Sequence, residues 1–572
     1  MLYHRNRKVI WLALCFAGLL IVSAIILLFA GTEYQIVDTD YSGPKEQSVA
    51  SPSFSVKSGF FDEPFFLEII IPEGTTVYYT LDCSDPTIES TVYNGPIYLE
   101  NASMHENVFS MRTDLSTGFY EKLIDEYAGE KIPGYSAPDY YIEKCCVVRA
   151  VSVDKDGNNS EIVSESYFIG MGELCPDNCR VISIVTDPAN LFDYNTGIYV
   201  TGKHFENYQL TGNYNALWHW WDANYRQKGK AWERKVYFTL FDENGTIITE
   251  KSVGIRIQGN ATRGFLPRNL QLFSRVEYDG QAFFEGTIFA EGYCPKKILL
   301  FCGEAYSQFN DYCINARSKD LNYATMSFQP CVLFLDGEYW GFYWLAEKFD
   351  EYYIQYHYGV RYDNIVMIKE DEVVAGKAED YQLYINASRF ITDNDMSKES
   401  NYLAACQLYD MDSYIDYYAT RIYIGSRDDW PSSNYALWRS LQKGDGEYED
   451  NRWRWMMFDC NAGNIISSAY VEENTLKYVL EVDRVFASLW KNDGFRNKFC
   501  SRILDIADSY FSGDDMRVFI QDYKQNFLPL LSQSWDRYYG KNNSILEKFN
   551  SRMSSAEQFF LLRSGVIRSW FE

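Results

Sequence analysis

The chain has 572 residues, of which 47% are hydrophobic and 17% aromatic, and its formal net charge is -26. A chain this acidic repels the phosphate backbone of nucleic acids, so we exclude a nucleic-acid-binding protein. It contains only five histidines, and none is paired at the His-x3-His spacing, which argues against a histidine-based zinc site.

A membrane anchor is expected at the N-terminus. Basic residues among the first eight positions precede the apolar run Val9–Ala30, which is long enough to cross a hydrocarbon core of roughly 30 Å. A cleaved signal peptide is the alternative, but the residues before Gly31 make a poor cleavage site. The basic flank should stay in the cytoplasm. We therefore expect a single-pass protein of the cell membrane, with most of the chain extracytoplasmic and a polar linker at 32–51.

The expected export of the chain bears on its cysteines. One of the 13 cysteines, Cys15, lies in the apolar run, and the others are spread along the sequence. Export permits disulfides, although the sequence does not fix their pairing. The candidates are Cys175 with Cys179, and Cys83 with Cys145 or Cys146.

The first folded part should be rich in β-structure. Short runs of β-branched and aromatic residues, each bounded by a Pro, Gly or Asp turn, predict strands at 65–71, 76–81 and 146–153. From about residue 180 the pattern becomes mixed. Strands are expected at 181–185 and 236–241, and apolar residues at spacings of three and four predict helices at 413–423, 484–511 and 516–538. The expected fold class is α+β.

Two acids and an amide follow regular elements late in the chain. Asp429 and Asn434 are separated by four residues, and Asp459 ends the strand-like run 453–458. Phosphoryl transfer needs one acid near the attacking hydroxyl, and a second acid and an amide on magnesium. The spacing therefore suggests a kinase-type site. Ordinary Asx turns are the alternative, because Asp and Asn flank loops in every protein.

Other polar residues have two interpretations each. The turn 259–264 lets backbone N–H groups approach an anion, with Arg256 and Arg263 adding charge, or it is a plain hairpin with solvated arginines. Glu347 either orients a basic phosphate ligand or pairs with a surface lysine. Lys369 ends the strand-like run before it and either faces a nucleotide or is simply exposed.

The pair Asp336-Gly337 is a type I′ hairpin signal, with Trp340–Tyr343 as the returning strand. We therefore interpret this block as architecture.

The β-rich part resembles the small chitobiase C-terminal-type β-sandwich of bacterial surface proteins over residues 52–170. Five blocks carry the likeness: Pro52–Ser55, Ser58–Phe61, Tyr79–Thr87, Tyr93–Ile97 and Val148–Ala150. Cys83 stands where that family has Gly, and 101–141 looks like an insertion. The resemblance implies a structural spacer or a module that contacts cell-wall glycan.

The region 180–572 resembles the spore coat protein H-like (CotH) kinases, an atypical protein kinase family. The likeness rests on four blocks: 254–264, 334–343 leading to Glu347, 429–434 and 453–459. It implies an atypical kinase-like domain using ATP and Mg²⁺, with Ser or Thr of surface or spore coat proteins as acceptor. In a family-like mechanism Asp429 takes the hydroxyl proton, Asn434 and Asp459 hold Mg²⁺, and arginines neutralise the phosphates.

The chain departs from that family at several positions. Asn269 replaces the expected phosphate-binding lysine, with Arg268 beside it as a possible substitute of different geometry. Leu300–Gly303 stands in place of a Leu-Arg-Asn-Gly-like strand, and Asn461 replaces an acid. These losses leave open a pseudokinase that binds or assembles surface proteins. A glycoside hydrolase is a third hypothesis, supported only by abundant acids and aromatics such as Trp218, Trp220 and Trp221.

Overall fold

The computed structural model describes residues 49–117, 135–172, 174–213, 216–303, 307–427, 430–460, 465–541 and 543–571. These residues belong to one compact unit, and they form the expected mixed α+β fold. The expected anchor at 9–30 lies outside them. Within the described ranges, no helix combines the length and apolar character that crossing a bilayer requires. The twelve cysteines in these ranges are free thiols.

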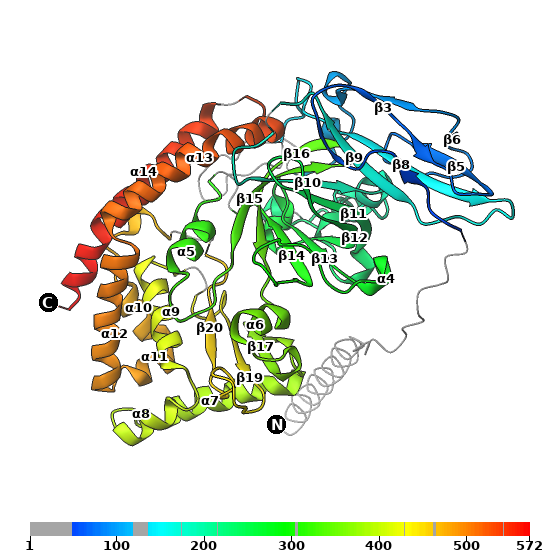
Figure 1. Ribbon diagram of the computed structural model, residues 1–572. Coiled ribbons are helices and arrows are strands. Elements are labelled where there is room, and N and C mark those ends of the chain that lie inside the picture. Colours follow the sequence, from blue (N-terminus) through cyan, green and yellow to red (C-terminus); the bar gives the residue numbers. More distant parts are fainter. Residues whose placement is uncertain are drawn as a thin grey trace, which may run out of the picture. The chain divides into compact units, whose positions relative to one another are not determined.

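The N-terminal sheets (Figure 1) hold a small core of their own around Val77, Val148 and Tyr167. The five-stranded sheet runs β2 (Gly59–Phe61), β9 (Val163–Ile169), β8 (Cys146–Asp154), β5 (Thr75–Thr80) and β6 (Thr91–Val92). Two short pairs accompany it, β1 (Ser53–Phe54) with β4 (Ile69–Ile70) and β3 (Phe65–Leu67) with β7 (Ile97–Leu99).

One predicted strand of this part is divided. The run 65–71 forms β3 and β4, which pair with different partners. Glu68 lies between them, and its backbone N–H donates to Ser55 Oγ at 3.0 Å while its carbonyl accepts from the Ser55 N–H at 2.9 Å. These two hydrogen bonds hold the chain at the point where pairing with β7 ends and pairing with β1 begins.

A closed barrel follows. Its strands are, in order, β10 (Arg180–Val185), β11 (Arg234–Phe241), β12 (Ile247–Ile257), β13 (Leu270–Phe273), β14 (Lys297–Phe301), β16 (Glu338–Glu347) and β15 (Phe328–Leu335). The parallel pair β10–β15 closes it, and the other pairs are antiparallel. All of β16 is buried, because its outer face contacts helix α13 (Gly513–Tyr539). The β15–β16 turn has φ values of 46° at Asp336 and 82° at Gly337, as a type I′ turn requires.

The N-terminal sheets pack on the barrel at this hairpin. The ring of Phe168 meets that of Phe334 edge to face at 4.9 Å. The buried carboxylate of Glu338 accepts hydrogen bonds from the N–H groups of Val108, at 2.5 Å, and Ser110, at 2.7 Å. This carboxylate therefore fixes the 108–110 segment to the barrel.

Replacing Glu338 by alanine should lower the free energy of unfolding by about 3 kcal/mol, because two buried N–H groups lose a charged acceptor. Denaturant unfolding measures the change. The exposed Glu379→Ala is the matched control and should fall within about 0.5 kcal/mol of the wild type. Equal stability of the two variants would contradict this assignment.

A second, antiparallel sheet lies beyond the barrel. Its order is β18 (Glu372–Ala375), β17 (Ile365–Lys369), β19 (Ala436–Ser440) and β20 (Arg454–Met456). Helix α9 (Met411–Tyr423) contacts β20, and α6 (Glu351–Tyr358) contacts β17 (Figure 1). All residues of α9 except Asp412 are buried, so this helix forms the centre of the C-terminal half.

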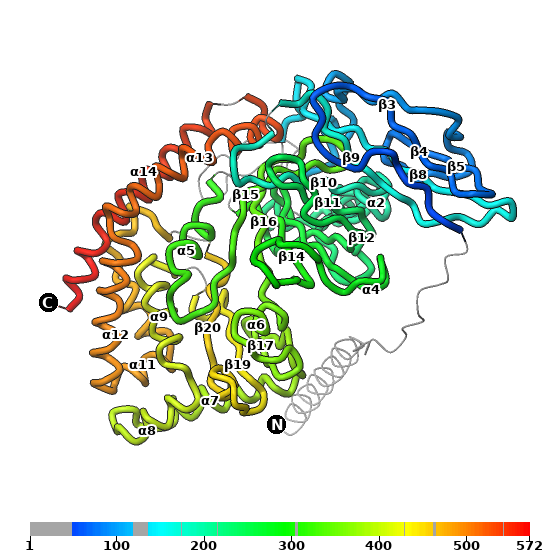
Figure 2. The backbone as a smooth tube through the Cα atoms, viewed as in Figure 1, coloured from blue at the N-terminus to red at the C-terminus, as the bar shows by residue number. Residues whose placement is uncertain are grey.

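The remaining helices surround these sheets. The predicted helix 484–511 is divided, because Asn492 caps a new helix by accepting from the Phe495 N–H at 2.9 Å. Helices α13 and α14 lie side by side (Figure 2). The bounds are α2 (Pro188–Phe192), α3 (Gly202–Leu210), α4 (Val276–Asp279), α5 (Asn310–Ser318), α7 (Tyr381–Asp393), α8 (Glu399–Ala405), α10 (Thr475–Val482), α11 (Arg484–Leu489), α12 (Asp493–Asp505) and α14 (Asn543–Ser569).

Arg563 of α14 holds the end of α9. Its fully buried guanidinium donates to the carbonyls of Ile422 at 3.0 Å and Tyr423 at 2.9 Å, which are among the last of α9. It also donates to the Glu473 carbonyl at 2.9 Å. A cation at this position satisfies carbonyls left open by the helix and complements its dipole.

Candidate functional site

The register of the second sheet gathers three predicted site residues. Lys369 pairs with Ala436, and Ala436 pairs with Met456, so the end of β17, the start of β19 and the end of β20 are level. Asn434 lies two residues before β19, and Asp459 lies three residues after β20. Lys369, Asn434 and Asp459 therefore lie at the same end of the sheet, on three strands that are far apart in sequence.

Arg421 ties the loops of Asn434 and Asp459 together. This arginine of α9 is 1% exposed. Its Nη2 donates to the Asn434 carbonyl at 2.8 Å and to the Phe458 carbonyl, and its Nη1 donates to the Asp459 carbonyl at 3.2 Å. One guanidinium thus fixes the backbone on both sides of the site.

The two loops share an uncommon conformation. Asn434 has φ 55° and Asp459 has φ 52°, in the left-handed region where Asn and Asp are enriched among residues with a side chain. Lys369 adds to the same arrangement, because its Nζ lies 4.3 Å from the ring of Phe458, the neighbour of Asp459.

Glu370, which follows Lys369, also touches the Asn434 loop. Its Oε1 accepts from the Asn434 N–H at 3.3 Å, and its carbonyl accepts from the Tyr435 hydroxyl at 2.8 Å.

Asp429 lies outside the described residues. The next residue, Trp430, is buried against the ring of Tyr418 at 5.2 Å. Asn461 also lies outside the described residues.

Amide and carboxylate oxygens are the ligands that Mg²⁺ prefers. In the described part of the chain, no group of three or more His, Cys, Asp or Glu is placed to hold a metal. Mg²⁺ does not need such a group, because it usually keeps waters and phosphate oxygens beside one or two protein ligands. The side chains of Asn434 and Asp459 fit that requirement.

A comparison with protein families identifies the family of this chain. The family described as CotH kinase protein matches residues 255–566, more than half of the chain. The chain belongs to the CotH kinase family. The resemblance read from the four sequence blocks is thus confirmed. A second family, described as Fn3 associated, matches residues 67–167, within the N-terminal sheets. Comparison with curated proteins gave no match.

Family membership suggests an atypical kinase and ATP use, yet three predicted phosphate ligands hold protein atoms here. Arg263 donates to the carbonyls of Gly259 at 2.7 Å and Gln227 at 2.9 Å. Arg268 is fully buried, donates to the Arg263 carbonyl at 2.8 Å, and lies over the ring of Tyr225. The contacts of these two arginines are structural, and they fix the turn 259–264; a role at the phosphates stays a prediction.

Arg256 is likewise engaged. Its Nε lies 3.4 Å from a carboxylate oxygen of Glu233, and its guanidinium lies over the ring of Phe273 at 4.0 Å. Lys230 and Arg275 pair with the same carboxylate, each at 2.7 Å. Arg256 is therefore part of a cluster of three cations around one buried acid.

Within the described residues Glu347 pairs with a histidine and not with a lysine, and its expected role beside a basic phosphate ligand stays a prediction. Its carboxylate is 1% exposed, accepts from the Ser327 N–H at 2.7 Å, and lies 2.7 Å from His357 Nε2. It links the end of β16 to α6.

Asn269 occupies the position where a CotH kinase usually has lysine. Its side-chain oxygen accepts from the Cys302 N–H at 2.7 Å, and the residue is 3% exposed. It therefore supports the barrel and supplies no positive charge.

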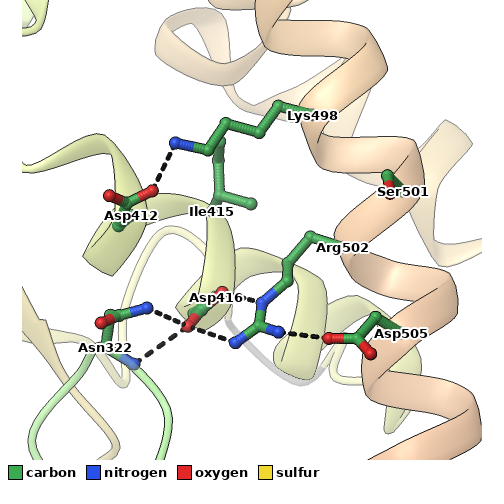
Figure 3. Close-up of a pocket in the computed structure, with 8 residues that line it drawn as sticks. All are labelled: Asn322, Asp412, Ile415, Asp416, Lys498, Ser501, Arg502 and Asp505. Atoms are coloured by element: carbon green, nitrogen blue, oxygen red, sulfur yellow. Dashed lines mark hydrogen bonds and ion pairs between the residues drawn. The ribbon is translucent and has the colours of Figure 1, made fainter.

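A cleft of about 620 Å³ lies elsewhere, between α9 and α12 (Figure 3). Both of its cations are paired, since Arg502 pairs with Asp416 at 2.6 Å and with Asp505, and Lys498 pairs with Asp412. No predicted site residue lines it. This cleft does not offer an unpaired cation to a phosphate.

Arg421 was not among the predicted site residues. The signal was available, since a single arginine interrupts the apolar, aromatic end of the 413–423 helix. A charge in such a helix must be satisfied by buried acceptors.

Proposed function

We propose that this CotH-family chain is an ATP-dependent protein kinase that phosphorylates Ser or Thr on cell-surface or spore coat proteins. The observation that carries this proposal is the shared sheet end, where Arg421 holds the loops of Asn434 and Asp459 beside Lys369. This arrangement supports a site in which two oxygen ligands and one ammonium group bind the same nucleotide.

In the proposed reaction the acceptor hydroxyl forms a bond to the γ-phosphorus while the bond from that phosphorus to the oxygen of ADP breaks. Asp429 takes the hydroxyl proton, a role implied by the family motif, and ADP leaves. Asn434 and Asp459 would hold Mg²⁺, which would neutralise charge on the phosphates. Lys369 offsets further phosphate charge, and Arg421 orients the two metal-binding loops.

The proposed location is the outer side of a cell membrane. It rests on the apolar run Val9–Ala30 and its basic flank. Contact of the N-terminal sheets with cell-wall glycan is part of the same proposal. It is supported by Phe66 and Tyr98, which are 66% and 52% exposed and whose rings lie 5.2 Å apart. Exposed aromatic rings of this kind suit the apolar faces of sugars.

Incubation of the purified full-length chain with ATP and Mg²⁺ should add phosphate to the chain itself or to a Ser/Thr-containing protein. Mass spectrometry detects each addition as an increase in mass equal to one phosphate group. A metal chelator should prevent it. A chain that binds MgATP and never incorporates phosphate, with any acceptor offered, would contradict the kinase proposal.

A pseudokinase that assembles surface proteins is the second candidate. The observation that favours it is Asn269, whose side chain is committed to Cys302. Thermal unfolding with MgATP separates the candidates, because a ligand at about a hundredfold its Kd stabilises by about 2.7 kcal/mol. No stabilisation at millimolar MgATP would favour the assembly protein.

A further inference from the structure

We propose that Glu370 is a positioning residue that fixes Asn434 for metal binding. Glu370 acts on the backbone of Asn434 and not on the metal itself. This inference rests on the proposed ATP-dependent function and adds one residue to its site. It also gives a role to the turn between β17 and β18, in which Glu370 lies.

Charged side chains hold both backbone polar groups of Asn434. Arg421 Nη2 of α9 donates to the Asn434 carbonyl at 2.8 Å, and Glu370 Oε1 accepts from the Asn434 N–H at 3.3 Å. Two side chains of opposite charge, from two separate elements, therefore hold one residue. Because they hold a backbone whose φ is 55°, they also set the direction in which the Asn434 side chain leaves it.

The backbone of Glu370 is itself held by Tyr435. The Glu370 N–H donates to the Tyr435 carbonyl at 3.0 Å, and the Tyr435 hydroxyl donates to the Glu370 carbonyl at 2.8 Å. These bonds extend the pairing of β17 with β19 by one residue beyond Lys369 and Ala436. The half-buried Glu370 therefore has a fixed place beside the start of β19.

The conformation of Glu370 is an uncommon one for glutamate. Its φ is 57°, in the left-handed region that glycine adopts without strain and that Asn and Asp tolerate. Strained backbone of this kind persists where the surroundings determine it, and it gathers at ligand sites. A turn alone would be served better by glycine. The glutamate side chain supplies what glycine lacks, which is an acceptor for the Asn434 N–H.

The turn also lies beside the second loop of the site. Lys369, the residue before Glu370, places its Nζ 4.3 Å from the ring of Phe458, and Arg421 donates to the Phe458 carbonyl. Glu370 thus belongs to the same sheet end as Asn434 and Asp459. Residues that hold metal ligands in place commonly contribute ten- to a hundredfold to metal affinity, roughly as expected here.

Mn²⁺ is the probe, used in place of Mg²⁺ with ADP present, so that binding is measured without phosphate transfer. Electron paramagnetic resonance reports the free Mn²⁺ in a titration of the full-length chain. Glu370→Gly should weaken binding about tenfold. It should still unfold within about 2 °C of the wild type, because glycine fits the left-handed backbone. Asp371→Gly removes the exposed acid of the same turn and is the matched control, with wild-type binding expected.

Two further variants separate the reach of the side chain from its charge. Glu370→Gln keeps the length and an oxygen that accepts from the Asn434 N–H, so binding should return to within a few fold of the wild type. Glu370→Asp keeps the charge and tolerates the backbone, but it is one methylene shorter and should bind as weakly as Glu370→Gly. The reverse order, with Asp strong and Gln weak, would show direct action on the cation and overturn the positioning role.

Hydrogen exchange gives a second readout that needs no metal. The peptide that contains Asn434 should exchange faster in Glu370→Gly than in Asp371→Gly, because the Asn434 N–H has lost its acceptor. Mass spectrometry of the peptides measures the difference. Equal exchange in the two variants would contradict the contact on which the inference depends.

The outcomes separate this inference from the proposed function. Wild-type phosphate transfer with unchanged Mn²⁺ binding in Glu370→Gly overturns the positioning role and leaves the kinase proposal intact. Mn²⁺ binding that depends on Glu370, without any phosphate transfer, does the reverse. Absence of Mn²⁺ binding to the wild type overturns the positioning role, whatever the result of the transfer experiment.

Discussion

Asp459→Asn should lower phosphate transfer from MgATP by about a thousandfold, because electrostatic stabilisation supplies most of the catalysis in this chemistry. The substitution removes one negative charge that would hold Mg²⁺. Asparagine tolerates the left-handed φ of 52° at this position, and the backbone carbonyl can still accept from Arg421. The loss should therefore reflect metal binding and not misfolding. Phosphate incorporation measured across a range of Mg²⁺ concentrations checks it.

Two further variants serve as a control and as a test that separates metal binding from proton transfer. Asp493→Asn changes a side chain that is 83% exposed and should retain full activity. Asp429→Ala should also abolish transfer, yet it should keep the stabilisation by MgATP, because a base does not hold the metal. Wild-type rates or wild-type Mg²⁺ dependence in Asp459→Asn would refute the metal-binding role.

Arg421→Met should lower the free energy of unfolding by roughly 4 kcal/mol. Three backbone carbonyls, of Asn434, Phe458 and Asp459, lose the guanidinium that donates to them, and that guanidinium belongs to a residue that is 1% exposed. Denaturant unfolding measures the loss. The two site loops should also separate, so MgATP should no longer stabilise whatever folded protein remains.

Two control variants test whether the loss of stability comes from the hydrogen bonds of the Arg421 guanidinium. Arg421→Lys retains the charge but cannot reach three carbonyls at once, so it should recover only part of the stability. Arg361→Met removes an arginine that is 75% exposed and should stay within about 0.5 kcal/mol of the wild type. Equal stability of Arg421→Met and Arg361→Met would show that the buried guanidinium does not hold the loops.

Local signals predicted local structure well. Asp336-Gly337 forms the expected turn, since only residues that accept positive φ fit there. The 413–423 pattern became α9, because the spacing of apolar residues reports which face is buried. The predicted helix 484–511 was wrong as one element. The side chain of Asn492 starts a second helix, and periodicity does not detect such a cap.

Contacts between segments that are far apart in the chain could not be predicted from the sequence. The barrel closes through β10 and β15, whose pairing depends on every strand between them. The pattern Gly259–Gly264 raised the possibility of phosphate-binding arginines. Whether Arg263 faces an anion or nearby carbonyls is decided by the segment around Gln227, which no local pattern places there.

The cap that Arg563 places on α9 bears on how the protein is made. Arg563 follows Asn434 and Asp459 in the chain, and it is the donor to the carbonyls at the end of the helix that carries Arg421. While the ribosome is still translating the segment before α14, those carbonyls have no such donor. We therefore expect the proposed site to become ordered only late in synthesis, once α14 has been made. Any use of ATP would begin only after that helix has packed against α9.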